Sequence, residues 1–156
     1  MTYKIRLLIV LSGVIFLICK EQTQDKTEYL ALNSINQLSE HPGKKLMETY
    51  CFACHNPTAS HDNRLAPPMI AIKKHYINSD TTKEEFVNSI QAWIKNPNED
   101  DAKMYGAVQR FGVMPKAPFL NEDIEKIADY IYENDITQPE WFDAHFKQMH
   151  DNNIKK

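Results

Sequence analysis

Tyr50-Cys51-Phe52-Ala53-Cys54-His55 contains two cysteines separated by two residues, with a histidine directly after the second. This spacing is the attachment signature for covalently bound haem c. Each thiol can add across one vinyl group of the porphyrin, and the adjacent histidine can then supply an axial nitrogen to the iron. We therefore expect Cys51, Cys54 and His55 to bind one haem, with His55 as an iron ligand.

The same cysteine pair could instead belong to a zinc site or to a redox-active dithiol. Structural zinc needs a second pair of cysteine or histidine ligands at a recognisable spacing, but no cysteine follows Cys54 and the histidines are scattered. A thioredoxin-like dithiol needs a βαβ context, which the sequence does not predict. The haem interpretation is therefore favoured over both.

The composition indicates an ordinary globular chain. Its 156 residues suffice for one domain, and 42% of them are apolar and 25% charged. The formal net charge of −3 argues against a nucleic-acid partner. The sequence also lacks the glycine-rich loops that hold nucleotides. An acidic chain of this kind suits a protein partner with a basic docking patch.

The amino terminus has the pattern of an export signal. Two basic residues precede an apolar run over residues 7–18, and a polar run follows it. The apolar run is shorter than the roughly 20 residues that a membrane span requires. Cys19 stands where a bacterial lipoprotein signal places its lipidated cysteine, although Ile18 replaces the small residue that usually comes before it. We therefore expect residues 1–18 to be a signal or anchor segment and Cys19 to be lipidated.

Two other interpretations of this terminus remain open, an uncleaved hydrophobic anchor and ordinary cleavage in which Cys19 has no role. All three place the protein outside the cytoplasm, in the periplasm or on the outer face of a bacterial membrane. Residues 19–41 are polar, with apolar positions that permit one amphipathic helix from about residue 28 to residue 38. We expect these residues to tether the following domain.

Helical signals recur through residues 42–133. A first helix is expected over about residues 42–52, because proline suits the first turn of a helix. Residues 56–80 are expected to form a loop. A capping box near Thr82 predicts a helix that ends before Asn96-Pro97. Asn121, a good N-cap, is expected to begin the last helix of this region.

Residues 134–156 extend beyond this region. Aromatic residues recur at helical spacing between Pro139 and His150. We expect an additional helix that covers the domain, and docking of a partner is the alternative role.

The attachment motif, Pro67, Met114-Pro115 and the final helix together resemble class I cytochromes c. The resemblance covers about residues 42–133. It implies an all-α cytochrome c fold of about three to five helices around one haem, with residues 134–156 as a helical extension. It also implies that the first and last helices cross closely at Gly43.

The resemblance further assigns the two faces of the iron. In that family, a proline about a dozen residues after the ligand histidine places its carbonyl on the other imidazole nitrogen, and Pro67 has this offset. Met114, in the loop before the last helix, is implied as the sixth ligand. Met104, a histidine or an open site are the alternatives. A thioether is soft and neutral and therefore favours ferrous iron.

These expectations describe a mono-haem electron carrier that is not an enzyme, because two fixed axial ligands leave no iron position for a substrate. The expected partners are redox proteins, such as a terminal oxidase or a dehydrogenase, with membrane attachment through the amino terminus. One alternative is a peroxidase-like haem enzyme or gas sensor with a displaceable distal ligand. Another is a fixed electron-transfer subunit of a larger oxidase or dehydrogenase complex.

Overall fold

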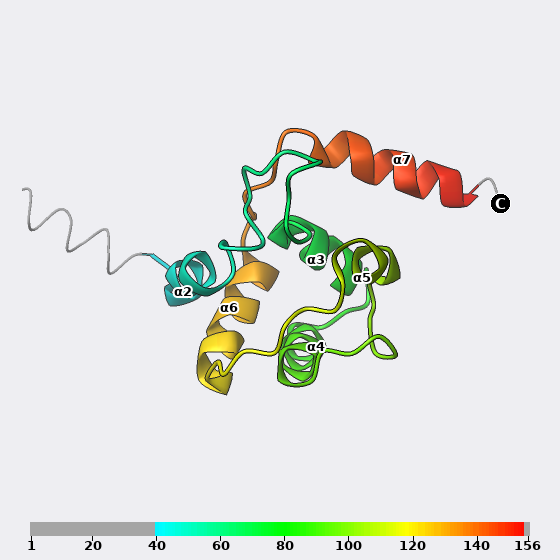
Figure 1. The fold of residues 1–156 in the computed structure, drawn as a ribbon. Coiled ribbons are helices and arrows are strands. Elements are labelled where there is room, and N and C mark those ends of the chain that lie inside the picture. The colour runs from blue at the N-terminus through cyan, green and yellow to red at the C-terminus, as the bar shows by residue number, and fades with distance from the viewer. Residues whose placement is uncertain (1–39, 155–156) are drawn as a thin grey trace, which may run out of the picture. The chain divides into compact units, whose positions relative to one another are not determined.

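The computed structural model describes residues 40–154, and all regular secondary structure in this range is helical. The expected signal segment, the tether and Cys19 lie outside the described residues. The chain divides into two units, Met1–Glu40 and His41–Lys156, and the helices below belong to the second. The described residues form six helices, which are labelled in Figure 1: α2 (Pro42–Tyr50), α3 (Met69–Tyr76), α4 (Lys83–Lys95), α5 (Tyr105–Phe111), α6 (Asn121–Glu133) and α7 (Phe142–Ile154). The prediction of an all-α fold is confirmed for this part of the chain.

Helix α6 packs against both α2 and α4, and it lies between them in Figure 1. Its crossing with α2 depends on Gly43. A Cβ atom at this position would overlap the carbonyl oxygen of Lys126 and would lie 2.8 Å from the Cβ atom of Tyr130. Only glycine therefore lets the two backbones approach so closely, and the close crossing that we expected at Gly43 is present.

A buried core joins α3, α4 and α6. The side chains of Phe86, Ala128 and Ile131 have no exposed surface. The Phe86 ring meets the Tyr76 ring edge-on, with 6.4 Å between centroids, and the Tyr132 ring is tilted against it at 5.9 Å. Burial of one phenylalanine contributes about 1.5–3 kcal/mol, so Phe86 helps to hold three helices together.

Helix α4 begins with the expected capping box. The Thr82 hydroxyl accepts a hydrogen bond from the Glu85 backbone N–H at 3.2 Å, and the Glu85 carboxylate accepts one from the Thr82 backbone N–H at 2.9 Å. The two side chains thus satisfy backbone donors that no helical carbonyl can reach. Because α4 ends at Lys95, before Asn96, the prediction for this helix is confirmed.

Two predictions of local structure are wrong. The loop predicted over residues 56–80 contains helix α3, which follows Pro68 as its N-cap. Its first three residues are buried, so core packing outweighs the loop signal of the preceding prolines. Asn121 does not cap α6 either, because the helix begins one residue earlier than expected. Leu120 holds the N-cap position, and its side chain makes no capping hydrogen bond.

The carboxy-terminal extension packs onto the same unit. Ile136 and Phe142 are buried, and the Phe142 ring stacks on the Phe146 ring at 5.5 Å. Phe146 in turn meets His75 of α3 edge-on at 6.0 Å. The start of α7 therefore contacts α3 through these rings, whereas Met149 farther along is exposed. In residues 40–154, no helix combines the length and the apolar character that a membrane crossing requires.

Candidate functional site

The two cysteines and the histidine of the attachment motif follow α2 in one tight turn. The Cys51 backbone N–H donates to the Met47 carbonyl at 2.9 Å, which ends the helix. The backbone N–H groups of Cys54 and His55 then both donate to the Cys51 carbonyl, at 3.2 and 2.8 Å. Cys51 is half-buried and Cys54 is exposed. The backbone therefore brings the three motif residues together on one turn.

The environment of Cys51 does not suit a redox-active thiol. Both are free thiols. Burial raises the pKa of Cys51 to about 11, so this thiol stays protonated at neutral pH. A redox-active cysteine needs the opposite, a lowered pKa that exposes a thiolate.

The His55 ring is fixed by the loop that follows it. Its Nδ1 atom lies 2.6 Å from the carbonyl oxygen of Pro67. Because a carbonyl can only accept a hydrogen bond, Nδ1 carries the proton and Nε2 keeps its lone pair. Burial lowers the pKa of His55, and the opposing effect of the Pro67 hydrogen bond is smaller. The ring is therefore neutral and presents one free nitrogen, which is the form that binds a metal.

Met114 lies in the segment of residues 112–120 between α5 and α6, which we call the methionine segment. Its side chain is half-buried, and the segment has no regular secondary structure. Gly112 ends α5 with a φ of 79°, a value that residues with a Cβ atom rarely adopt. Met104, the second candidate ligand, is the N-cap residue of α5.

The methionine segment contacts the attachment turn at its carboxy-terminal end. The Phe119 ring stacks on the Tyr50 ring, with 5.2 Å between centroids. The Tyr50 hydroxyl also donates to the Asp123 carboxylate at 3.2 Å, which raises the pKa of Tyr50. Since Tyr50 directly precedes Cys51, this end of the segment is tied to the start of the motif.

The end of α5, directly before the methionine segment, contacts the loop that lies between His55 and Pro67. The Arg64 guanidinium carbon lies 5.4 Å from the centre of the Phe111 ring, at the end of α5. Arg64 and Arg110 both donate to the carbonyl oxygen of His61, Arg110 at 3.0 Å. The residues on either side of Met114, Phe111 before the segment and Phe119 within it, are therefore both connected to the part of the chain around His55.

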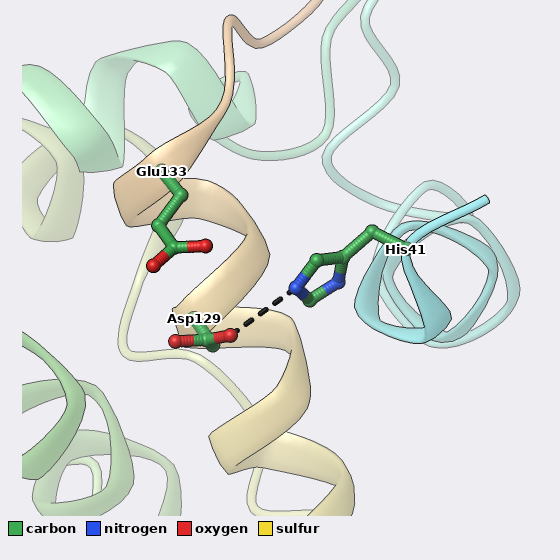
Figure 2. Close-up of side chains that lie close together, drawn as sticks. All are labelled: His41, Asp129 and Glu133. Carbon is green, nitrogen blue, oxygen red and sulfur yellow. Dashed lines mark hydrogen bonds and ion pairs between the residues drawn. The ribbon is translucent and has the colours of Figure 1, made fainter. Parts of the chain in front are cut away.

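A second cluster of metal-ligating residue types lies away from the motif. In the described part of the chain, His41, Asp129 and Glu133 are close enough together to hold a metal ion. Figure 2 shows the His41 ring directed at Asp129, with Glu133 one turn farther along α6. The group contains none of the motif residues, so it gives no support to a zinc site at Cys51 and Cys54.

Hydrogen bonding argues against a metal in this second cluster. His41 Nδ1 accepts from the Gly43 backbone N–H at 3.1 Å, so Nε2 carries the proton and donates to Asp129 at 3.1 Å. A protonated Nε2 has no lone pair for a metal. In addition, the Lys83 ammonium group is paired with both carboxylates, at 2.7 Å from Glu133. His41, Lys83, Asp129 and Glu133, which we call the clasp, link the start of α2 and the start of α4 to the surface of α6.

Comparison with known proteins gave no match to a protein-family model, to a curated protein or to a solved structure. The interpretation of the site therefore rests on its residues and their geometry.

Proposed function

We propose that this chain is a mono-haem c-type cytochrome that transfers single electrons outside the cytoplasmic membrane. Cys51 and Cys54 would hold the haem through thioether bonds, and His55 and Met114 would ligate its iron. The observation that carries the proposal is the 2.6 Å distance from His55 Nδ1 to the Pro67 carbonyl oxygen. This contact leaves Nε2 of a neutral imidazole available immediately after the two thiols.

The proposal includes a cytochrome c fold for residues 42–133. Helices α2 to α6 would surround the haem, and the close crossing of α2 and α6 at Gly43 supports this arrangement. The position of the cysteines directly after α2 supports it as well. Residues 134–156 would then be an extension of the fold.

When bound, the haem would supply one-electron chemistry between ferric and ferrous iron. His55 would bind the iron through Nε2, and the Pro67 carbonyl would keep its ring from rotating. Met114 would bind the iron as well and so exclude water and exogenous ligands from it. Because both ligands would stay bound in both oxidation states, the protein around the iron would rearrange little between them.

The proposed location rests on the sequence pattern of residues 1–19. A lipid at Cys19 would keep the carrier on a membrane face and raise its effective concentration near membrane redox complexes. Redox proteins of the terminal oxidase or dehydrogenase type are the proposed partners.

A pair of methionine substitutions tests the proposal. The wild type should retain haem on a denaturing gel, and its ferric form should show the sulfur-to-iron charge-transfer absorption band. Met114→Ala should abolish this band and lower the reduction potential, because loss of the thioether removes a ligand that favours ferrous iron. It should also allow the ferrous protein to bind carbon monoxide. Met104→Ala, the matched control, should keep the band.

Two results would contradict the assignment. Survival of the band in Met114→Ala would show that another residue is the sixth ligand. Strong carbon monoxide binding by the folded wild type would favour a haem enzyme or gas sensor over a carrier.

A further inference from the structure

We infer that Trp141, in the carboxy-terminal extension, is a positioning residue for the methionine segment. The inference rests on the proposed function and adds a residue outside the proposed haem domain. It begins with α5, the helix that leads into the segment and contributes no buried residue to the core. Contacts other than core packing must therefore hold the carboxy-terminal end of α5.

Arg64 supplies such a contact, because its guanidinium lies between two aromatic rings. Its central carbon is 4.7 Å from the centre of the Trp141 ring and 5.4 Å from the centre of the Phe111 ring. A guanidinium is attracted to the electron-rich face of an aromatic ring. Arg64 thereby bridges the extension and the last residue of α5.

Contacts of its own hold Trp141 in place beside Arg64. Its indole N–H donates to the Ala59 carbonyl at 2.9 Å. The His61 ring meets it edge-on at 5.1 Å. The next residue, Phe142, is only 3% exposed and fixes the chain in the core.

The bridge also opposes an electrostatic repulsion. Arg64 and Arg110 converge on the carbonyl oxygen of His61. Burial lowers the pKa of Arg64, and the positive charge of Arg110 lowers it further, whereas nearby Asp62 acts in the opposite direction. Without the Trp141 ring, the hydrogen bond to the His61 carbonyl would be left to hold Arg64 beside Arg110 and Phe111 against this repulsion.

Movement of Phe111 would also shift the backbone that carries Met114, the proposed sixth ligand. Only Gly112 and Val113 separate Phe111 from Met114. A looser α5 end should increase the fraction of molecules in which Met114 has left the iron. An added ligand that binds only this open form would then bind more tightly.

The test uses the full-length ferric holoprotein and imidazole, which competes with the methionine sulfur for the iron. Trp141→Leu should raise the affinity for imidazole roughly tenfold, equivalent to about 1.4 kcal/mol. Trp141→Phe keeps an aromatic face beside Arg64 but loses the hydrogen bond to Ala59, so it should give a smaller increase. Arg64→Gln breaks the same bridge and should match Trp141→Leu.

Phe146→Leu is the matched control in the same extension, because its ring contacts Phe142 and His75 rather than Trp141 or Arg64. It should lower the unfolding temperature, because these ring contacts are lost, while leaving the imidazole affinity at the wild-type value. The inference is overturned if Trp141→Leu and Arg64→Gln keep the wild-type affinity, or if Phe146→Leu raises it equally. A wild type without covalent haem would instead refute the proposed function, and this inference with it.

Discussion

The crossing of α2 with α6 and the methionine segment are held in different ways. At the crossing, Gly43 brings one helix backbone against the carbonyl of Lys126 on the other. The clasp centred on His41 and Asp129 adds a hydrogen bond between the same two helices. The methionine segment is instead held by side chains at its two ends, through the rings of Phe111 and Phe119.

This difference separates two parts of the molecule. The crossing of α2 and α6 forms the stiff half, and α5 with the methionine segment forms the more adaptable half. Backbone packed against backbone leaves no room for displacement, because interiors are close-packed. Stacked rings and cation–π contacts tolerate small shifts, because neither requires a fixed atom-to-atom distance. The stiff half places the thiols and His55, whereas the adaptable half carries Met114. Substitutions in each half can test this contrast.

The largest effect is expected for Gly43→Ala. The added methyl group would overlap the Lys126 carbonyl oxygen, so the helices must separate or the backbone must distort. We expect a loss of about 3 kcal/mol or more in the free energy of unfolding, at the upper end of the cost of overpacking. Chemical denaturation followed by circular dichroism would measure it.

Gly106→Ala is the matched control in the other half. A Cβ atom at Gly106, within α5, would have no neighbour within 4 Å. Alanine is a better helix former than glycine, so this variant should gain about 0.5–1 kcal/mol. Equal losses in the two glycine variants would contradict the contrast between the halves.

A smaller loss is expected for His41→Ala. The substitution removes the acceptor for the Gly43 backbone N–H and the contact with Asp129. Loss of an N-cap costs about 0.5–2 kcal/mol, and we expect the upper part of this range in thermal unfolding. His41→Asn should recover most of the capping contribution, because asparagine is a strong N-cap, but its shorter side chain would lose Asp129. If alanine and asparagine were equally destabilising, the bond to Asp129 would dominate.

The sequence predicts those features of this molecule that depend on fixed offsets. The resemblance to class I cytochromes c implied the contact of His55 with Pro67 and the close helix crossing at Gly43, and both are present. The capping box at Thr82 was predictable because both of its partners lie within four residues. Local spacing therefore determined much of the α2, α4 and α6 framework.

The contacts around the methionine segment were not predictable in this way. The partners Arg64 and Trp141, or Tyr50 and Phe119, are far apart in the sequence, and each pair makes a single contact without a periodic pattern. The helical turns of α5 were missed as well, because α5 buries no residue and so shows no apolar stripe. The capping role of His41 was not predicted, because histidine is not among the preferred N-caps.

The smallest effect concerns pH and the docking of α7. The His145 ring lies 4.8 Å from that of His61. Burial lowers the pKa of His145 below its ordinary value of 6.5, and the nearby charges of His61, Arg64 and Arg110 lower it further. Protonation of His145 therefore favours the state in which α7 has moved away from His61. The stabilising contribution of neutral His145 should be complete above pH 6.5 and should be lost as the pH falls through the lower folded value.

Hydrogen exchange can detect this change in one helix. The protection factors of α7 amides, relative to those of α4, should decrease modestly as the pH falls below 6.5. His145→Gln removes the titrating group and should flatten this dependence, whereas His150→Gln, at an exposed position of the same helix, should retain it. Protection of α7 that did not change with pH would mean that Phe142 alone holds the helix. If only α7 responds to pH, the adaptable half of the molecule includes α7, the helix that follows Trp141 and its contact with Arg64.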